Sequence, residues 1–251
     1  MDPLLILKGD FQKLANPEKA KVLQRFFKTG KGEYGEGDKF LGITVPQIRN
    51  LVKKYRGLGF PEIDKLLHSS FHEERLLGLL IMVSQFEKGE PKTQEKIFNY
   101  YLANTKYINN WDLVDLTAPK IVGEYLWERH AEFISASIFN EKRILNQVQD
   151  DVLYKLVKSS SIWERRIAIL ATFAFLRKNE FTQTLKIAEI LLHDKEDLIH
   201  KAVGWMLREV GKRNLEVEEE FLKTYGQVMP RTMLRYAIEK WDLQKKKSLI
   251  Q

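Results

Sequence analysis

One pattern decides the fold, and it is clearest in SIWERRIAILATFAFL (161–176), EDLIHKAVGWMLREVG (196–211) and PRTMLRYAIEKW (230–241). Each stretch has a polar start, then a charged residue, then an apolar run with helical spacing. Two earlier stretches follow the same pattern, HEERLLGLLIMVSQF (72–86) and NNWDLVDLTAPKIVGEYL (109–126). A single helix pair cannot bury its apolar stripe, so stacked pairs share a continuous core. The repetition predicts an all-α solenoid of paired helices, an α-α superhelix.

Helix-start signals near the N-terminus support this prediction. NPE (16–18) has the order of an N-cap, a first-turn proline and an acidic residue. TVP (44–46) opens a second helix that ends at Gly57. The stretch between them, 29–43, is too rich in glycine for a helix, and we expect a long ordered loop. Sustained alternation typical of strands is missing, so we predict essentially no sheet.

Basic residues recur with the repeat. The chain has 41 Lys and Arg against 34 Asp and Glu, a net charge of +7 that suits a polyanionic partner. When the repeats are placed in one register, one position holds Arg75, Arg166, Lys201 and Arg235. The last three are spaced by 35 and 34 residues. Isolated solvated helix residues would explain the charge but not this spacing, so we predict a basic inner face that holds nucleic acid.

Composition excludes several classes of site. Cysteine is absent, and the five histidines show no metal-ligand spacing such as HExxH. No apolar run approaches the ~20 residues needed to span a bilayer. The first residues lack the pattern of a secretory signal. We therefore expect a cytoplasmic monomer without metal, cofactor or membrane contact.

One gap breaks the repeat. The step into the stretch at 161 is about 16 residues too long, and the surplus lies around RHAEFISASIFNEKRILNQVQDD (129–151). This stretch resembles a translated palindromic genomic repeat element. We expect one repeat domain over 1–251, with an exposed and dispensable insertion at about 129–151.

Indoles and charged residues share helix faces. Trp111 and Asp115 are four residues apart, so they project from one side of a helix. Asp115 falls near the register position that is basic in other repeats. Lys201, Trp205 and Arg208 also share a face. Each Trp alone would be read as a packing residue. Together, indole, carboxylate and arginine predict a site for a cationic ligand.

These stretches resemble a known family. WDLVD (111–115), WERRIAIL (163–170) and KAVGWMLRE (201–209) are similar to signatures of the HEAT-like-repeat DNA alkylation repair proteins, which are bacterial alkylpurine DNA glycosylases. YGEGDKFLGITVPQIR (34–49) and MPRTMLRYAIEK (229–240) are similar to common sequences of that family. The resemblance covers nearly the whole chain except 129–151, and it implies HEAT-like helix pairs.

The resemblance also implies roles for single residues. Asp115 would be the catalytic carboxylate, with Trp111 and Trp205 on either side of the lesion-bearing nucleotide. Arg166 would contact the DNA backbone, and Arg208 would add a further contact. Phe26 stands where an active family member carries Tyr, so the ring is kept and a polar contact is lost.

The function implied is excision of cationic N3- or N7-alkylated purines from double-stranded DNA, without a base-flipping pocket. Asp115 would stabilise the positive charge that develops on the sugar. No lysine is singled out as a Schiff-base nucleophile, so strand cleavage is not expected. Two alternatives stay open: a non-catalytic solenoid that recognises damaged or branched DNA by shape, and a protein-binding scaffold.

Overall fold

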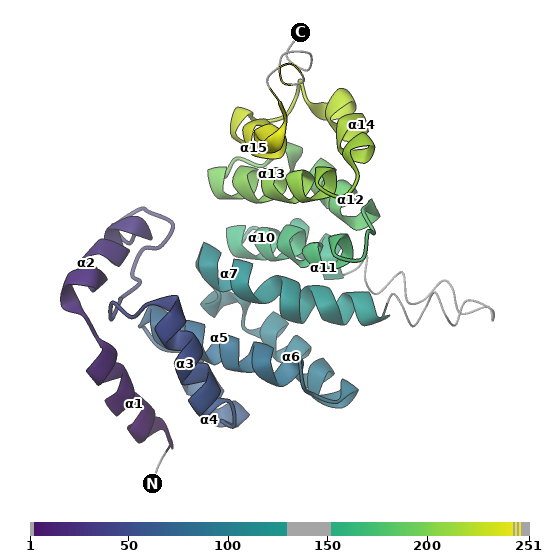
Figure 1. Ribbon diagram of the computed structural model, residues 1–251. Coiled ribbons are helices and arrows are strands. Elements are labelled where there is room, and N and C mark those ends of the chain that lie inside the picture. The colour runs from purple at the N-terminus through teal and green to yellow at the C-terminus, as the bar shows by residue number, and fades with distance from the viewer. Residues whose placement is uncertain (1–2, 130–151, 243, 245, 247–251) are drawn as a thin grey trace. The chain divides into compact units, whose positions relative to one another are not determined.

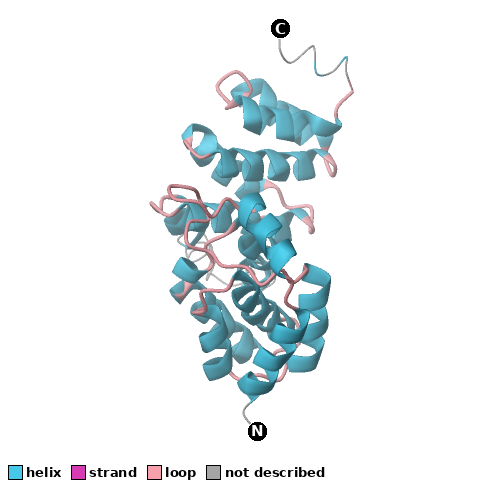
Figure 2. Cartoon of the chain, turned by 90° about the vertical axis from the view of Figure 1, so that its left-hand side faces the viewer, coloured by secondary structure: helices cyan, strands magenta, loops and turns pink. Residues whose placement is uncertain are grey.

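The computed structural model describes residues 3–129, 152–242, 244 and 246, and its regular elements in these ranges are all helices (Figures 1 and 2). Within the same ranges, extended pairing is limited to one isolated bridge between Lys39 and Phe71. The prediction of an all-α chain is therefore confirmed. The chain divides into two compact units, Met1–Thr117 and Ala118–Gln251.

The first unit is built from seven α-helices and one short 3-10 helix in its described part. They are α1 (Pro3–Leu14), α2 (Pro17–Phe26), α3 (Val45–Tyr55), α4 (Phe60–Leu67), α5 (His72–Phe86), α6 (Pro91–Ala103), η1 (Thr105–Tyr107) and α7 (Trp111–Ala118). The helix α5 is central, because most of its side chains are buried and α3, α4 and α6 pack against it. The core of this unit therefore lies around α5.

Both predicted helix starts are present. The side chain of Asn16 accepts a hydrogen bond from the backbone N–H of Lys19 at 3.0 Å, and Pro17 is the first residue of α2. At the start of α3, the side-chain oxygen of Gln47 accepts the backbone N–H of Thr44 at 2.9 Å. These caps satisfy backbone donors that have no partner inside a helix.

The second unit continues the helical chain. A π-helical turn, η2 (Pro119–Gly123), follows α7 directly. Pro119 has no backbone N–H to donate, so the regular pattern of helical hydrogen bonds is interrupted at this residue. Residues 124–129 and 152–157 are helical. The remaining elements are α10 (Ile162–Ala171), α11 (Phe173–Leu176), α12 (Thr182–Ile190), η3 (Leu191–His193), α13 (Asp197–Gly211), α14 (Leu215–Tyr225), α15 (Arg231–Ala237) and η4 (Ile238–Lys240).

The helix α13 is the centre of this unit and packs against α10, α14 and α15. Gly204 allows α15 to come close. A Cβ atom at this position would lie 2.4 Å from the backbone oxygen of Met233 and 2.5 Å from Cβ of Tyr236. The glycine within the GWMLRE stretch is therefore required by helix packing.

A local device recurs at three helix starts. The residue two positions before the N-cap makes two hydrogen bonds. Its side-chain oxygen accepts the backbone N–H of the N-cap residue, and its backbone oxygen accepts a hydrogen bond from the side chain six residues further on. The three pairs are Ser69 with Arg75, Ser159 with Arg165 and Asp194 with His200. This repetition fixes the structural register of α5, α10 and α13.

The register corrects one prediction. Arg75 corresponds to Arg165, whereas Arg166 corresponds to Lys201 one position later in the helix. Arg75 is only 3% exposed and forms an ion pair with Asp38. Arg75 therefore does not share the register position of Arg166, Lys201 and Arg235, and its guanidinium pairs with the buried carboxylate of Asp38. A contact of Arg75 with DNA stays a prediction.

Two further expectations concern other parts of the chain. The proposed insertion at 129–151 lies outside the described residues, apart from Arg129, so its status stays a prediction. Across the described ranges, we find no helix with the length and apolar character needed to cross a membrane.

Candidate functional site

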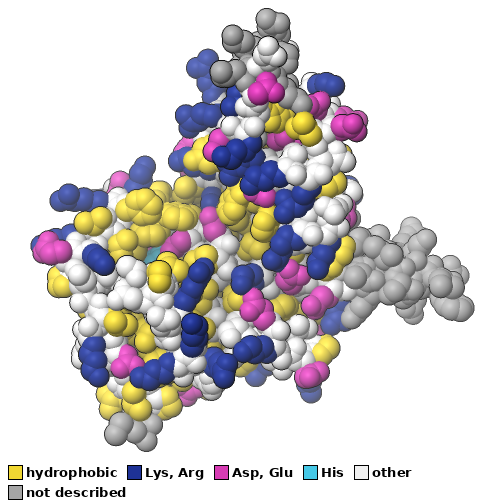
Figure 3. All heavy atoms as spheres, in the orientation of Figure 1, with side chains coloured by type: hydrophobic (Ala, Val, Ile, Leu, Met, Phe, Trp, Pro, Cys, Tyr) yellow, Lys and Arg dark blue, Asp and Glu magenta, His cyan; other side chains and the backbone are white. Residues whose placement is uncertain are grey.

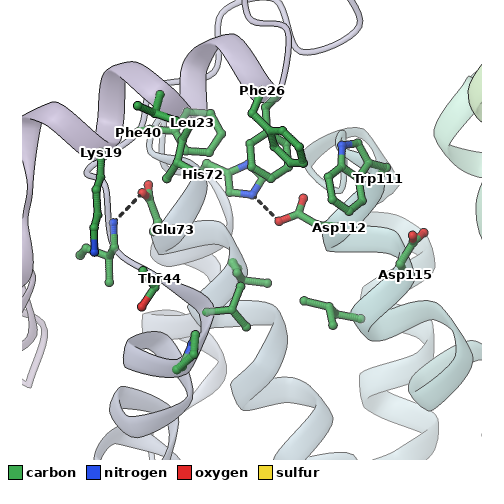
Figure 4. A pocket seen from close by; sticks show the side chains of 17 residues that line it. Lys19, Leu23, Phe26, Phe40, Thr44, His72, Glu73, Trp111, Asp112 and Asp115 are labelled. Atoms are coloured by element: carbon green, nitrogen blue, oxygen red, sulfur yellow. Dashed lines mark hydrogen bonds and ion pairs between the residues drawn. The ribbon is translucent and has the colours of Figure 1, made fainter.

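A pocket of about 570 Å³ opens in the first unit (Figure 4). Its walls come from α2, the end of the glycine-rich loop, and the first turns of α3, α5 and α7. Most of the side chains that line it are aromatic or aliphatic. Trp111, Asp115 and Phe26 all line this pocket, so the structure brings together three of the predicted site residues. The sequence does not predict the pocket itself.

Trp111 is held by aromatic packing. Its ring stacks on Phe27, with centroids 5.1 Å apart and an interplanar angle of 18°. The ring of Phe26 meets it edge-on at 5.8 Å. Phe26 is 61% exposed, so it forms the outer rim of the pocket. Figure 3 shows hydrophobic side chains gathered over α2 and the loop after it, with Lys and Arg around them.

Asp115 lies one helical turn after Trp111 on α7, and both side chains leave the same helix (Figure 4). Asp115 is half-buried. The arrangement places a carboxylate beside an indole at the edge of an apolar pocket. A cation bound there would meet a negative charge and an aromatic surface together.

At the wall of the pocket, His72 connects two carboxylates. Its Nδ1 donates to Oδ2 of Asp38 at 3.1 Å, and its Nε2 donates to Oδ2 of Asp112 at 2.9 Å. Burial alone would lower the pKa of His72, but the charges and hydrogen bonds of Asp112 and Asp38 outweigh burial and raise this pKa to about 9. His72 is therefore an imidazolium at neutral pH, with both ring nitrogens acting as donors.

Two more side chains complete this buried network. The guanidinium of Arg75 pairs with Oδ1 of Asp38, and Nδ2 of Asn110 donates to Oδ2 of Asp38 at 3.2 Å. Burial opposes ionisation of Asp38, yet the hydrogen bond from His72 and the charge of Arg75 lower its pKa. Two cations balance two carboxylates, so the network is neutral overall. Such pairing is what makes buried charge tolerable.

The glycine-rich loop, residues 29–43, is tied to α5 next to this network. The carboxylate of Glu73 accepts backbone N–H groups of Leu41, Gly42 and Ile43 at 2.8–3.2 Å. Gly42 has a φ of +80°, and a Cβ atom there would lie 2.1 Å from the backbone oxygen of Asn16. The loop is therefore ordered, as predicted, and it delivers Asp38 to His72.

The other predicted site residues lie in the second unit. Trp205 is half-buried, and its Nε1 donates to Oε1 of Glu209 at 3.3 Å. Lys201 pairs with Asp197 at 2.7 Å, and Arg208 pairs with Glu239. Arg235 is exposed.

Arg166 differs from the expectation. It is only 5% exposed, and its Nη1 donates to the backbone oxygen of Leu198. The position on α10 that we expected to be basic and exposed is therefore buried, because the guanidinium of Arg166 binds a backbone oxygen at the start of α13. A contact of Arg166 with DNA stays a prediction.

Sequence reasoning missed the buried network. Asp38 and Asp112 lie inside stretches that resemble the family, but neither they nor His72 and Asn110 were singled out as site residues. The available signal was weak: two polar residues next to a tryptophan, and a histidine at the polar start of a helix that is apolar further on.

Comparison with known proteins identifies the family. The model of a family described as DNA alkylation repair enzyme matches residues 7–241. The chain belongs to the DNA alkylation repair enzyme family. This membership confirms the predicted resemblance and supports a role in the repair of alkylated DNA. No curated protein matches the chain significantly.

A solved structure confirms the fold of this family member. The chain is similar to a predicted DNA alkylation repair enzyme from Enterococcus faecalis, with 17% sequence identity and a TM-score of 0.66. The match covers 91% of this chain and 97% of that chain. At this identity the likeness concerns the fold alone, which is the predicted α-helical superhelical repeat.

Proposed function

We propose that this protein is a monofunctional DNA glycosylase that excises cationic N3- or N7-alkylated purines from double-stranded DNA. One observation carries the proposal: Asp115 and Trp111 stand one turn apart on α7 and line the same aromatic pocket. The pairing of a carboxylate with an indole suits a reaction in which positive charge develops on the substrate.

The reaction is hydrolysis of an N-glycosidic bond. The bond from C1′ of the sugar to N9 of the purine breaks, and both electrons leave on the base, which becomes neutral. Positive charge develops on C1′ and the ring oxygen, where the carboxylate of Asp115 stabilises it. A water oxygen then bonds to C1′ and gives a proton to Asp115. The alkylated purine is already a good leaving group, so no general acid is required.

The aromatic residues bind the charged sugar and its neighbours. Trp111 presents a ring whose position is fixed by its stack on Phe27, and Phe26 extends the aromatic surface outward. Because the chemistry is assigned to the sugar, it does not require the base to enter the pocket. We assign the second aromatic contact to Trp205.

Contacts to the phosphates are assigned to the second unit. Arg235 is exposed, and Lys201 and Arg208 make ion pairs on partly exposed side chains, which phosphate oxygens would compete for. These contacts would be independent of sequence and would weaken as salt rises. We propose that the protein acts as a monomer.

The proposal is tested by release of 7-methylguanine and 3-methyladenine from alkylated duplex DNA under protein excess. Wild type should release both bases, and Asp115→Asn should lower the single-turnover rate by roughly 100-fold, the range seen when one electrostatic stabiliser is removed. The matched control is Asp64→Asn, which makes the same change on α4 away from the pocket and should keep the wild-type rate.

The outcomes separate the alternatives. If wild type binds the DNA but releases no base, the protein is a non-catalytic DNA-binding member of the family. If wild type shows no salt-dependent affinity for DNA, the DNA-directed proposal fails altogether. If Asp115→Asn is as fast as Asp64→Asn, Asp115 is not the catalytic carboxylate.

A further inference from the structure

The two residues next to Trp111 in the sequence are both held by the buried network. Oδ1 of Asn110 accepts the backbone N–H of Trp111 at 2.9 Å, while the amide nitrogen of the same side chain donates to Asp38. On the other side, Asp112 accepts from His72 through Oδ2 and from the N–H of Leu113 through Oδ1, both at 2.9 Å. The first turn of α7 is thus fixed from both sides.

The ring of Trp111 is fixed through the same histidine. Phe27, on which Trp111 stacks, lies 5.0 Å from the rings of both Phe40 and His72. Phe40 in turn stacks on His72 at 4.6 Å with an interplanar angle of 20°. One imidazole therefore contacts both Asp112, which follows Trp111 in the sequence, and Phe27, on which Trp111 stacks.

Every charged member of the network is buried, with exposures of 7% for Asp38, 2% for His72, 3% for Arg75 and 7% for Asp112. Replacing a whole buried ion pair by apolar residues often costs little stability, whereas removing one partner alone is destabilising. The directional hydrogen bonds of such pairs impose one geometry on the groups they join. Here they join the glycine-rich loop, α5 and α7, the last of which carries Trp111 and Asp115.

We infer that Asp38 and His72 are positioning residues, which hold the first turn of α7 so that Trp111 and Asp115 keep a reactive geometry. In this role both residues act through α7 and not on the reacting atoms. The glycine-rich loop thereby has a role in the site, because it supplies Asp38. The effect on excision rests on the proposed function, whereas the effect on the orientation of Trp111 does not.

The second unit offers a matched control. Asp194 is also a carboxylate paired with the arginine of the recurring helix start: its Oδ2 lies 2.6 Å from Nε of Arg165, which corresponds to Arg75. Asp38→Asn and Asp194→Asn therefore remove the same kind of pair, each by an isosteric change. Only Asp38 is connected to Asn110 and His72. Both variants should lose stability, and only one should disturb α7.

The first experiment compares excision and binding at a temperature where each variant is fully folded by circular dichroism. Asp38→Asn should lower the single-turnover rate about 10- to 100-fold, as small displacements of catalytic groups do. Its dissociation constant for undamaged duplex should stay within about twofold of wild type, because phosphate contacts are unchanged. Asp194→Asn should keep the wild-type rate. Equal rates for the two variants would overturn the inference.

The second experiment needs no activity. Protein labelled with 5-fluorotryptophan should give five fluorine resonances, one for each Trp, and Trp111→Phe identifies the signal of Trp111. Asp38→Asn should shift or broaden that signal more than the other four, and Asp194→Asn should leave it in place. An unmoved signal in Asp38→Asn would overturn the inference even if wild type is an active glycosylase.

His72→Gln supplies an independent variant should Asp38→Asn fail to fold. Glutamine keeps a single donor group and cannot donate to Asp38 and Asp112 from opposite sides. We expect the same loss of rate and the same displaced Trp111 signal. If wild type releases no base but both variants displace that signal, the proposed function fails and the positioning role stands.

Discussion

Nε2 of His72 lies 2.9 Å from Oδ2 of Asp112, and this contact joins the first residue of α5 to the first turn of α7. The two residues are separated by 40 positions in the sequence. The contact connects the core helix of the first unit to the helix that carries Trp111 and Asp115. Its strength depends on the charge of His72, so pH can test it directly.

We expect the free energy of unfolding to fall as the pH rises from 6.5 to above 9. The pKa of His72 is about 9 in the folded protein, against an ordinary value of 6.5. A raised folded-state pKa stabilises the protein fully below the unfolded value, and this stabilisation is lost as pH rises through the folded value. The shift corresponds to a contribution on the order of 3 kcal/mol. Urea unfolding at pH 6.5 and 9.5 measures it.

The control for this prediction is His72→Gln, which lacks the titrating group. The difference in unfolding free energy between wild type and His72→Gln should be large at pH 6.5 and small at pH 9.5. Tyrosine and lysine residues titrate in both proteins, so their effects cancel. A difference that does not change with pH would show that His72 is not charged in the folded state.

Arg235 and Arg166 should behave differently although both were predicted to contact DNA. Arg235 is exposed, so Arg235→Ala should weaken DNA binding and lower the salt slope by about 1, with little effect on stability. Arg166→Ala should instead lower the free energy of unfolding by about 1–3 kcal/mol, since it removes a buried guanidinium and its hydrogen bond to the backbone oxygen of Leu198. Fluorescence anisotropy and urea unfolding distinguish the two effects.

A loss of affinity in Arg166→Ala at unchanged stability would contradict this division. It would mean that Arg166 leaves the carbonyl of Leu198 and turns to a phosphate when DNA is bound. Arg235→Lys serves as a control, because it retains the charge and should retain the salt slope.

Gly204→Ala should destabilise the protein by about 1–3 kcal/mol, because the new methyl group would meet the backbone of α15 in a packed interface. Gly9→Ala is the matched control. Gly9 also lies inside a helix, and a Cβ atom there has no neighbour within 4 Å, so alanine should raise stability by up to about 1 kcal/mol. Thermal unfolding of both variants tests the prediction, and equal shifts in midpoint would refute it.

Phe26→Ser should weaken binding to alkylated duplex severalfold while leaving the unfolding free energy nearly unchanged. Its side chain is 61% exposed at the rim of the pocket, so it contributes more contact area to a ligand than to the core. Leu5→Ser makes a similar change at a 65% exposed residue of α1 and should leave binding unaffected. Equal affinities of the two variants would remove Phe26 from the binding surface.

Local signals in the sequence predicted much of the fold. The starts of α2 and α3 depend on residues within four positions of each other, so Asn16 and Thr44 could be assigned as caps. The pair Trp111 and Asp115 follows from one helical turn. These relationships are set by the geometry of a single helix, which short-range sequence spacing reflects directly.

The remaining features depend on tertiary contacts. Asp38 meets His72 and Asn110 across 34 and 72 positions, and spacing carries no information about such meetings. The register of Arg75 was wrong by one residue, because arginine at either of two neighbouring helix positions gives the same pattern of residue types. The hydrogen bond from Arg75 to Ser69, which Arg165 repeats with Ser159, distinguishes them.

The contacts of Asp38 also bear on the order of folding. The bridge from Asp38 to Asn110 closes a loop of 72 positions, so we expect it to form later in folding than the local turns of α5 and α7. A chain caught before that closure would already present basic helices to DNA, yet Trp111 and Asp115 would have no fixed geometry. On the proposed function, we therefore expect the incompletely folded protein to bind DNA without reaction until the contact of Asp38 with Asn110 has formed.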